Sequence, residues 1–125
     1  VISIVGRFLE HSRIFYFYNN GDEQIFIGSA DWMPRNLDRR VEVITPIKDQ
    51  DIAKDIQEVL GIMLADNRQA WELNSNGNYI QRKPHEDSPE AGSQKTLMQI
   101  ALDKSTNVSN LISSKKNSLY LVDLP

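Results

Sequence analysis

The sequence contains no cysteine, so disulfide bonds and zinc sites built on thiolates are excluded. It has no apolar run long enough to cross a membrane as a helix, and no secretory signal peptide. Its formal net charge is −3, whereas general nucleic-acid binders carry an excess of basic residues. These absences predict a cytoplasmic protein with no transmembrane segment and no nucleic-acid partner.

The residues that are present have the proportions of an ordinary globular chain. Of the 125 residues, 40% are hydrophobic and 25% are charged, which suits one small domain. The chain begins with Val1 rather than methionine, inside a predicted strand over residues 1–5 that is apolar at nearly every position. Such a strand is expected to be covered on both faces. We therefore interpret the chain as a piece excised from a larger protein.

A predicted hairpin organises the N-terminal third of the chain. A strand over residues 13–18 is rich in Ile, Phe and Tyr, and a return strand covers residues 24–27. Between them lies Asn-Asn-Gly-Asp, and Asn and Gly tolerate the positive φ that tight hairpins need. Both flanks of an antiparallel hairpin lie at the same end, so polar residues on the flanks should meet there. These flanking residues are His11, Arg13, Ser29 and Asp31.

The flanking residues suit chemistry on phosphate. His11 can hold or release a proton near neutral pH, attack phosphorus as a nucleophile, or protonate a leaving oxygen. Arg13 lies on the same side of an extended segment and offers a positive fork for phosphate oxygens. The Gly28–Ser29 turn adds a hydroxyl and backbone N–H groups. Phosphoryl transfer depends mainly on positioning and charge stabilisation, so the grouping predicts such a site.

A cationic segment leads away from the hairpin. Pro34 suits the first turn of a short helix, and Asp31 could cap that helix. We expect Arg35 to lie in the site and at least one of Arg39 and Arg40 to lie at the surface.

A third strand is predicted over residues 41–47. Alternation puts Glu42 on the face opposite Val41 and Val43. Two interpretations of Glu42 stay open: a structural ion pair with an arginine, or orientation of His11 by its carboxylate.

The remaining segments are assigned by periodicity and composition. Residues 49–66 have apolar positions at helical spacing, with Asp49 or Asp51 as cap and first-turn acid. Residues 70–73 and 79–81 are expected to form a second hairpin. Three regions follow from this: a domain over 1–82, a linker or flexible loop over 83–93, and a C-terminal helix and tail over 94–125. The helix is expected to end near residue 103, and residues 118–124 suit a short strand or a docking tail.

The order of these motifs resembles one half of the phospholipase D superfamily signature, which is His-x-Lys, a strand, a Gly-Ser-x-Asn turn and a downstream acid. Here Arg13 replaces the Lys, Asp31 replaces the Asn, and Glu42 is the acid. The surrounding GRFLEHSRIFYF and IGSADWMPRNLDRRVEVITPI are more specific. They are similar to the C-terminal catalytic domain of the long-chain, histidine-phosphorylating polyphosphate kinases. The resemblance covers about residues 2–82.

This resemblance implies a phospholipase D-like α/β fold: a mixed sheet of roughly five strands with one long packed helix, forming one half of a two-unit catalytic module. It implies reversible transfer of the ATP terminal phosphate to inorganic polyphosphate through a phosphohistidine upstream of this chain. ATP and Mg²⁺ would be the cofactors, with the metal ligands outside the chain. ADP and the upstream domains are further expected partners, and a homo-oligomer is left open. The excised chain alone would be inactive.

The resemblance also implies roles for individual residues. His11 and Arg13 would be catalytic, with His11 as acid/base or electrostatic catalyst, and Glu42 would orient. The residues expected to bind ATP or phosphate are His11, Arg13, Ser29, Asp31 and Arg35. No metal ligand is assigned.

Two alternative functions stay open. One is a phospholipase D-like phosphodiesterase or nuclease half, which would use His11 on a diester; Arg13 and Asp31 depart from the usual Lys and Asn of that branch. The other is a non-catalytic domain that binds phosphate-rich ligands.

Overall fold

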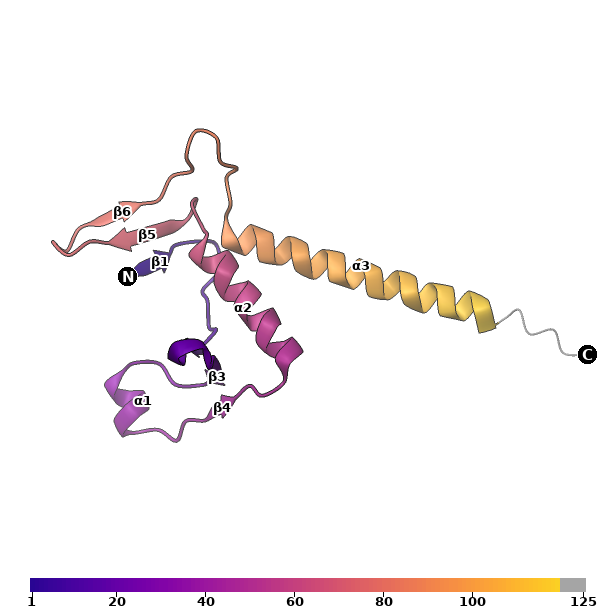
Figure 1. The fold of residues 1–125 in the computed structure, drawn as a ribbon, viewed down its shortest axis with the longest axis horizontal. Helices are drawn as coiled ribbons and strands as arrows, with labels where there is room; N and C mark the ends of the chain where they lie inside the picture. Colours follow the sequence, from indigo (N-terminus) through magenta and orange to yellow (C-terminus); the bar gives the residue numbers. More distant parts are fainter. Residues whose placement is uncertain (120–125) are drawn as a thin grey trace, which may run out of the picture. The chain divides into compact units, whose positions relative to one another are not determined.

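The computed structural model describes residues 1–119, with side-chain surroundings as far as residue 109, and it divides the chain into two compact units (Figure 1). The first unit combines Val1–Arg7 with the chain from Ile62 onward, and the second is Phe8–Gly61. Helix α2 (Gln50–Leu64) begins in the second unit and ends in the first. No helix of the described residues is both long and apolar enough to span a membrane.

The second unit is built on an antiparallel three-stranded sheet. Its strands, in the order β2-β3-β4, are Ile14–Phe17, Gln24–Gly28 and Ile44–Pro46. The predicted turn between the first two is confirmed as a short 3-10 turn, Asn19–Gly21, whose φ angles are 43°, 54° and 93°. Asn and Gly tolerate these left-handed conformations better than other residues. The hairpin closes with Ile14 opposite Ile27.

The first unit holds a second antiparallel sheet of order β1-β5-β6. Its strands are Ile2–Ile4, Ala70–Leu73 and Tyr79–Gln81, so the second hairpin also forms as predicted. Helix α3 (Ser93–Leu119) follows the loop after β6.

Helix α2 confirms the predicted helix and its cap. The Asp49 carboxylate Oδ1 accepts hydrogen bonds from the backbone N–H groups of Asp51 and Ile52, at 2.9 and 3.1 Å. This satisfies two of the donors that the first helical turn leaves without partners. The apolar stripe is only partly covered, because Ile52 and Leu64 are 51% and 61% exposed.

Asp66 ties together three elements of the first unit. Its side chain is fully buried, and its Oδ1 accepts hydrogen bonds from the amides of Arg68, Gln69 and Ala70, at 2.9, 2.7 and 3.2 Å. Its Oδ2 accepts the amide of Ser93 at 2.7 Å. One carboxylate therefore links the end of α2, the start of β5 and the first residue of α3.

The structure differs from the sequence-based expectations in three respects. The α/β class is confirmed, but the strands form two antiparallel sheets in place of one mixed sheet of roughly five strands. The strands divide into two sheets because β1 pairs with β5, which follows α2 in the sequence, while β2, β3 and β4 pair with one another in chain order. Strand β1 is an edge strand, and the flanking Val1 and Val5 are 84% and 66% exposed, so it is not covered on both faces.

The third difference concerns α3. It continues past residue 103 to Leu119, because the polar stretch that follows contains no proline or glycine to end it. Most of the predicted tail strand, from residue 120 onward, lies outside the described residues. The segment over residues 83–93 has no helix or strand before α3 begins at Ser93, and its far end is held by Asn67. The backbone amide of Asn67 donates a hydrogen bond to the Ala91 carbonyl at 3.0 Å, and its side-chain nitrogen donates to the Pro89 carbonyl at 3.1 Å. The proposed domain boundaries stay predictions.

Burial alone would raise the pKa of Asp66, but the hydrogen bonds from Gln69, Ser93 and Arg68 outweigh it and hold the pKa below its usual value. A depressed pKa in the folded state means that Asp66 stabilises the fold above its unfolded-state pKa of about 4. This contribution is lost as the pH falls through the lower pKa of the folded state.

We predict that Asp66→Ala lowers the free energy of unfolding by roughly 3 kcal/mol at pH 7, because several buried amides lose a charged acceptor. Asp66→Asn should cost less and should weaken the loss of stability in acid. Urea unfolding of both variants at neutral and acidic pH measures this. Asp51→Asn is the control, because that side chain is 96% exposed and should change stability by about 0.5 kcal/mol or less. An Asp66→Ala variant as stable as the control would contradict the prediction.

Candidate active site

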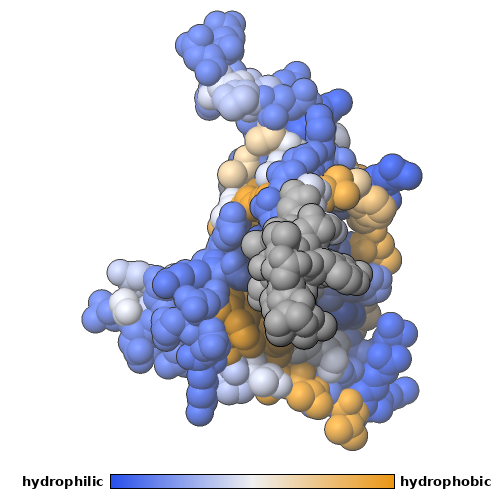
Figure 2. All heavy atoms as spheres, turned by 90° about the vertical axis from the view of Figure 1, so that its right-hand side faces the viewer, coloured by the Kyte–Doolittle hydropathy of each residue, from blue (hydrophilic) through white to orange (hydrophobic). Residues whose placement is uncertain are grey.

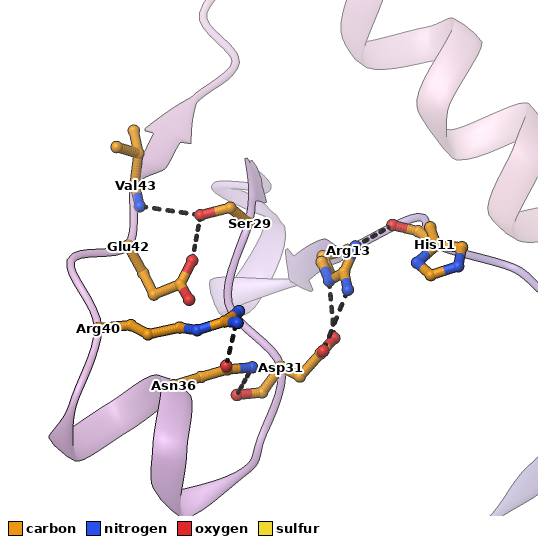
Figure 3. A network of polar contacts seen from close by, with 8 residues as sticks. All are labelled: His11, Arg13, Ser29, Asp31, Asn36, Arg40, Glu42 and Val43. Atoms are coloured by element: carbon orange, nitrogen blue, oxygen red, sulfur yellow. Dashed lines mark hydrogen bonds and ion pairs between the residues drawn. The ribbon is translucent and has the colours of Figure 1, made fainter.

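The hairpin brings the predicted flanking residues to one end, as expected. The amide of Gly28 donates to the carbonyl of Arg13 at 3.1 Å, which extends the β2–β3 ladder by one step toward the flanks. Beyond this bond the chain leaves β3 through Ser29 and Asp31, and on the other side it enters β2 from His11. Figure 3 shows these residues around the hairpin end.

The best-defined contact of the site is the ion pair between Arg13 and Asp31. The guanidinium donates from Nε to Oδ1 at 2.7 Å and from Nη2 to Oδ2 at 3.0 Å, while its Nη1 donates to the carbonyl of His11 at 2.7 Å. Hydrogen bonding to Arg13, together with its positive charge, holds the pKa of Asp31 below its usual value. The same hydrogen bonds, together with the negative charges of Asp31 and Glu42, raise the pKa of Arg13. Both groups therefore stay ionised across the neutral range.

Asp31 was expected to cap the short helix α1 (Pro34–Asp38), and that expectation is wrong. The N-cap residue is Met33, without a side-chain cap, and Pro34 starts the helix as predicted. The Asp31 carboxylate is instead taken by Arg13, whose charge makes the stronger partner. The carbonyl of Asp31 accepts the Met33 amide at 2.8 Å, which closes the turn before α1.

Ser29 joins the two ends of the loop that contains α1. Its hydroxyl donates to the Glu42 carboxylate and accepts the Val43 amide at 3.1 Å, and its own amide donates to the carbonyl of Val43 at 3.0 Å. Of the two interpretations left open for Glu42, neither describes the contact seen here, because Ser29 is its hydrogen-bond partner. Glu42 also precedes β4, which begins at Ile44 rather than at residue 41.

His11 is exposed, and no contact joins its ring to the Arg13–Asp31 pair among those drawn in Figure 3. Its backbone carbonyl, rather than its imidazole, makes the contact with Arg13. Arg35 is also exposed, on α1, where its carbonyl accepts the Arg39 amide at 3.2 Å. The imidazole is therefore open to a ligand, while its backbone is tied to the strand end.

Sequence reasoning missed Asn36, which is 3% exposed. Its side-chain nitrogen lies 3.5 Å from the carbonyl of Asp31, and its Oδ1 lies 3.5 Å from Nη1 of Arg40. It thus links α1 to the turn that carries Asp31 and to an arginine downstream. The only local signal was an asparagine inside a short helix, where its intrinsic propensity is low.

A shallow cavity of about 230 Å³ opens beside the ion pair. Arg13 and Asp31 line it together with Phe15 and Trp32, whose rings meet edge to face with their centroids 6.4 Å apart. Within the described residues, no three His, Cys, Asp or Glu side chains gather in a way that could hold a metal ion. The carboxylates of Asp31 and Glu42 are already bonded to Arg13 and Ser29, so the site does not fit Mg²⁺.

Comparison with known proteins shows which family the chain belongs to. Residues 1–94 match the family described as polyphosphate kinase C-terminal domain 2. A polyphosphate kinase of Thermosynechococcus vestitus is 64% identical over 98 residues, and one of Synechocystis is 54% identical over 106 residues. These alignments cover 78% and 85% of this chain but only 13% and 15% of the relatives.

A solved structure agrees with the sequence matches. The crystal structure of polyphosphate kinase from Porphyromonas gingivalis superposes with a TM-score of 0.76 at 36% identity, covering 85% of this chain and 16% of that one. The fold is thus the phospholipase D-like α/β class that the resemblance implied. The chain belongs to the polyphosphate kinase C-terminal domain 2 family. The family match also runs beyond residue 82, where we had placed the end of the resemblance, to residue 94.

Close packing at Gly28 yields a stability prediction. A Cβ at this position would lie 3.0 Å from the carbonyl oxygen of Val43 and 3.1 Å from Cγ1 of Ile44. That carbonyl is held by Ser29, so it cannot move aside freely. We predict that Gly28→Ala lowers the free energy of unfolding by about 1–3 kcal/mol.

Gly61 is the matched control for Gly28→Ala. It lies inside α2, and among the described residues an added Cβ there would meet no heavy atom within 4 Å beyond its chain neighbours and the nearby backbone of its own helix. Gly61→Ala should therefore stabilise the protein by roughly 0.5–1 kcal/mol through helix propensity. Urea unfolding of both variants checks the pair. A Gly28→Ala variant that gains stability as Gly61→Ala does would show that the β3–β4 turn is not closely packed.

Proposed function

We propose that this chain is part of the catalytic module of a polyphosphate kinase that reversibly transfers the terminal phosphate of ATP to inorganic polyphosphate. The observation that carries the proposal is an exposed imidazole, that of His11, beside a fixed ion pair at the open end of a hairpin. The hairpin lies inside the segment that matches the family. The names of the relatives, polyphosphate kinase throughout, support the substrate class.

The proposed reaction consists of two successive displacements at phosphorus. A histidine upstream of this chain attacks the terminal phosphorus of ATP, so a P–N bond forms while the P–O bond to ADP breaks. The terminal oxygen of a polyphosphate chain then attacks the same phosphorus, and the P–N bond breaks. His11 stabilises the developing charge or protonates the leaving oxygen. Since the described residues do not fit Mg²⁺, we propose that the ligands of this cofactor lie outside the chain.

Residues around His11 are proposed to guide phosphate. The Ser29 hydroxyl and the exposed Arg35 are candidates for direct contact with phosphate oxygens. Asp31 is itself an anion, so it serves the site through Arg13 rather than by direct contact with phosphate. Glu42 orients Ser29, to which it is bonded, in place of His11.

We further propose that upstream domains of the same polypeptide, or a second copy, cover part of this chain. Ile25 and Ala70 are the two hydrophobic residues classed as buried among those described, while Trp32, Val41 and Leu9 are 84%, 99% and 82% exposed. Figure 2 shows hydrophobic side chains between hydrophilic ones on the face in view. Exposed apolar surface of this kind is typical of an interface.

In the full-length protein, we predict that His11→Ala lowers the rate of polyphosphate synthesis by about 10²–10⁴-fold, because a general acid/base or charge-stabilising group is lost. The melting temperature should stay close to that of the wild type, since His11 is exposed. Initial rates of polyphosphate formation from ATP, with a thermal melt of each variant, measure the two quantities.

His85→Ala is the matched control, because His85 lies in the segment after β6 that has no helix or strand. Equal activities of the two variants would mean that His11 is incidental. Hydrolysis of a phosphodiester by the wild-type protein would favour the phosphodiesterase or nuclease alternative. Polyphosphate binding without turnover by the full-length protein would favour the alternative of a non-catalytic binding domain. The 125-residue chain by itself is a separate case: it should show no turnover, because it lacks the upstream histidine.

We predict that the excised 125-residue chain self-associates through apolar side chains that other domains would cover. Sedimentation velocity should show a sedimentation coefficient that rises with concentration. Val41→Ser, at a position 99% exposed, should weaken the association without unfolding the chain. A monodisperse monomer over a wide concentration range would refute this proposal.

A further inference from the structure

We propose that Arg13 and Asp31 are positioning residues that hold the backbone of His11, and that Arg13 is not a direct phosphate ligand. The proposal rests on the function proposed above for His11. It changes the role that the sequence suggested for Arg13, a free positive fork that receives phosphate oxygens. The structure shows that fork already engaged.

The contacts of the guanidinium carry the argument. Asp31 takes the edge formed by Nε and Nη2, at 2.7 and 3.0 Å, in the two-point geometry that suits a carboxylate. The remaining nitrogen, Nη1, donates to the His11 carbonyl at 2.7 Å. A phosphate could occupy the same edge only by displacing an ionised carboxylate. Each of the three guanidinium nitrogens therefore donates one hydrogen bond within the protein, which uses three of the five N–H groups of the side chain.

The burial of the pair agrees with a supporting role. The side chains of Arg13 and Asp31 are only 25% and 31% exposed, whereas His11 is exposed. Phe15 and Trp32 line the cavity beside the pair. A partly covered, two-point ion pair is better fixed than an exposed one, because its geometry is constrained on both sides.

The pair also connects His11 to the turn that precedes α1. The turn that carries Asp31 is closed by the Met33 amide and contacted by the buried Asn36 of α1. The segment before β2, which carries His11, has no helix or strand of its own. Through Arg13, the turn before α1 therefore restrains the backbone of the segment that carries His11. A misplacement of about 1 Å at a catalytic group can cost roughly 10²-fold in rate.

Replacing Asp31 separates a positioning role from a ligand role by the sign of the effect. If Arg13 binds phosphate and Asp31 merely competes for it, Asp31→Ala frees the fork and lowers KM for ATP. If the pair positions His11, Asp31→Ala lowers kcat and leaves KM for ATP nearly unchanged. The two residues then act as a unit, so the double variant is no worse than Arg13→Ala alone.

The test measures kcat and KM for ATP in the full-length protein for Arg13→Ala, Arg13→Lys, Asp31→Ala and the Arg13→Ala/Asp31→Ala double variant. We expect kcat to fall about 10- to 100-fold in each, with KM for ATP within about threefold of the wild type. Arg13→Lys should fail to restore kcat, because a single ammonium cannot bridge Asp31 at two points and reach the His11 carbonyl.

Arg82 supplies a matched control in the first unit. Its Nε donates to Oε1 of Glu72 at 2.6 Å, its Nη2 lies 2.5 Å from the same oxygen, and its Nη1 donates to the Leu64 carbonyl at 2.5 Å. Arg82→Ala should reduce thermal stability without the specific fall in kcat. Amide hydrogen exchange gives a readout that does not depend on turnover. Exchange at residues 11–13 should rise in Arg13→Ala and Asp31→Ala but not in Arg82→Ala.

Three outcomes would overturn the proposal: a lower KM for ATP in Asp31→Ala, wild-type kcat in Arg13→Lys, or effects of the two alanine variants that multiply in the double variant. Unchanged hydrogen exchange at residues 11–13 would also overturn it. Failure of the proposed function is a separate result. It would appear as a wild-type full-length protein that makes no polyphosphate, while the exchange data would still report on the positioning of His11.

Discussion

The antiparallel pairing of β2 with β3 is the interaction on which the candidate site depends. Its ladder fixes Ile14 opposite Ile27 and is extended by the bond between the Gly28 amide and the Arg13 carbonyl. Every residue of the site lies just beyond the ends of these two strands or in the loop that returns to β4. A slip of one residue would turn each side chain to the other face and separate the flanks. The three left-handed residues of the turn, Asn19 to Gly21, hold the register at the opposite end.

Buried and half-buried charged side chains join the elements of this chain through hydrogen bonds, whereas larger domains rely more on a hydrophobic core. Asp66 joins α2, β5 and α3, and Arg13 joins the strand entrance to the turn before α1. Few hydrophobic residues are buried among those described, since a unit of this size cannot remove much apolar surface from water. The chain spans 13–16% of the length of the three polyphosphate kinases compared above.

The charges of the site form an ordered set rather than a general cationic patch. Net charge is negative over the whole chain, and two of the acidic residues near the hairpin end are bonded to Arg13 and Ser29. These bonds leave His11 and Arg35 as exposed groups that could face an anion. On the function proposed above, such a site would attract phosphate locally although this chain carries a negative net charge.

Local signals determined a large part of the fold. The Asn-Asn-Gly turn, the apolar spacing of α2 and its Asp49 cap, and the hairpin of β5 and β6 were all readable in the sequence, because each depends on residues close together in the chain. The flanking motif also indicated the family, since its residue types and spacing are specific. The helical extent of α3 was underestimated, because serine, threonine and asparagine lower helix propensity without preventing a helix.

The tertiary structure alone decided which partner each charged residue takes. By sequence Asp31 could cap α1, yet it pairs with Arg13, and Glu42, for which an arginine or His11 was the expected partner, bonds Ser29. The partner of each charged residue depends on distances between segments far apart in the chain, and local periodicity in the sequence does not report these distances. The division of the strands into two sheets was likewise hidden, because β1 reaches β5 only after the whole second unit has intervened. Sequence determined most of the helices and strands and the family, whereas the nonlocal pairing of backbone and charge determined how the elements are connected.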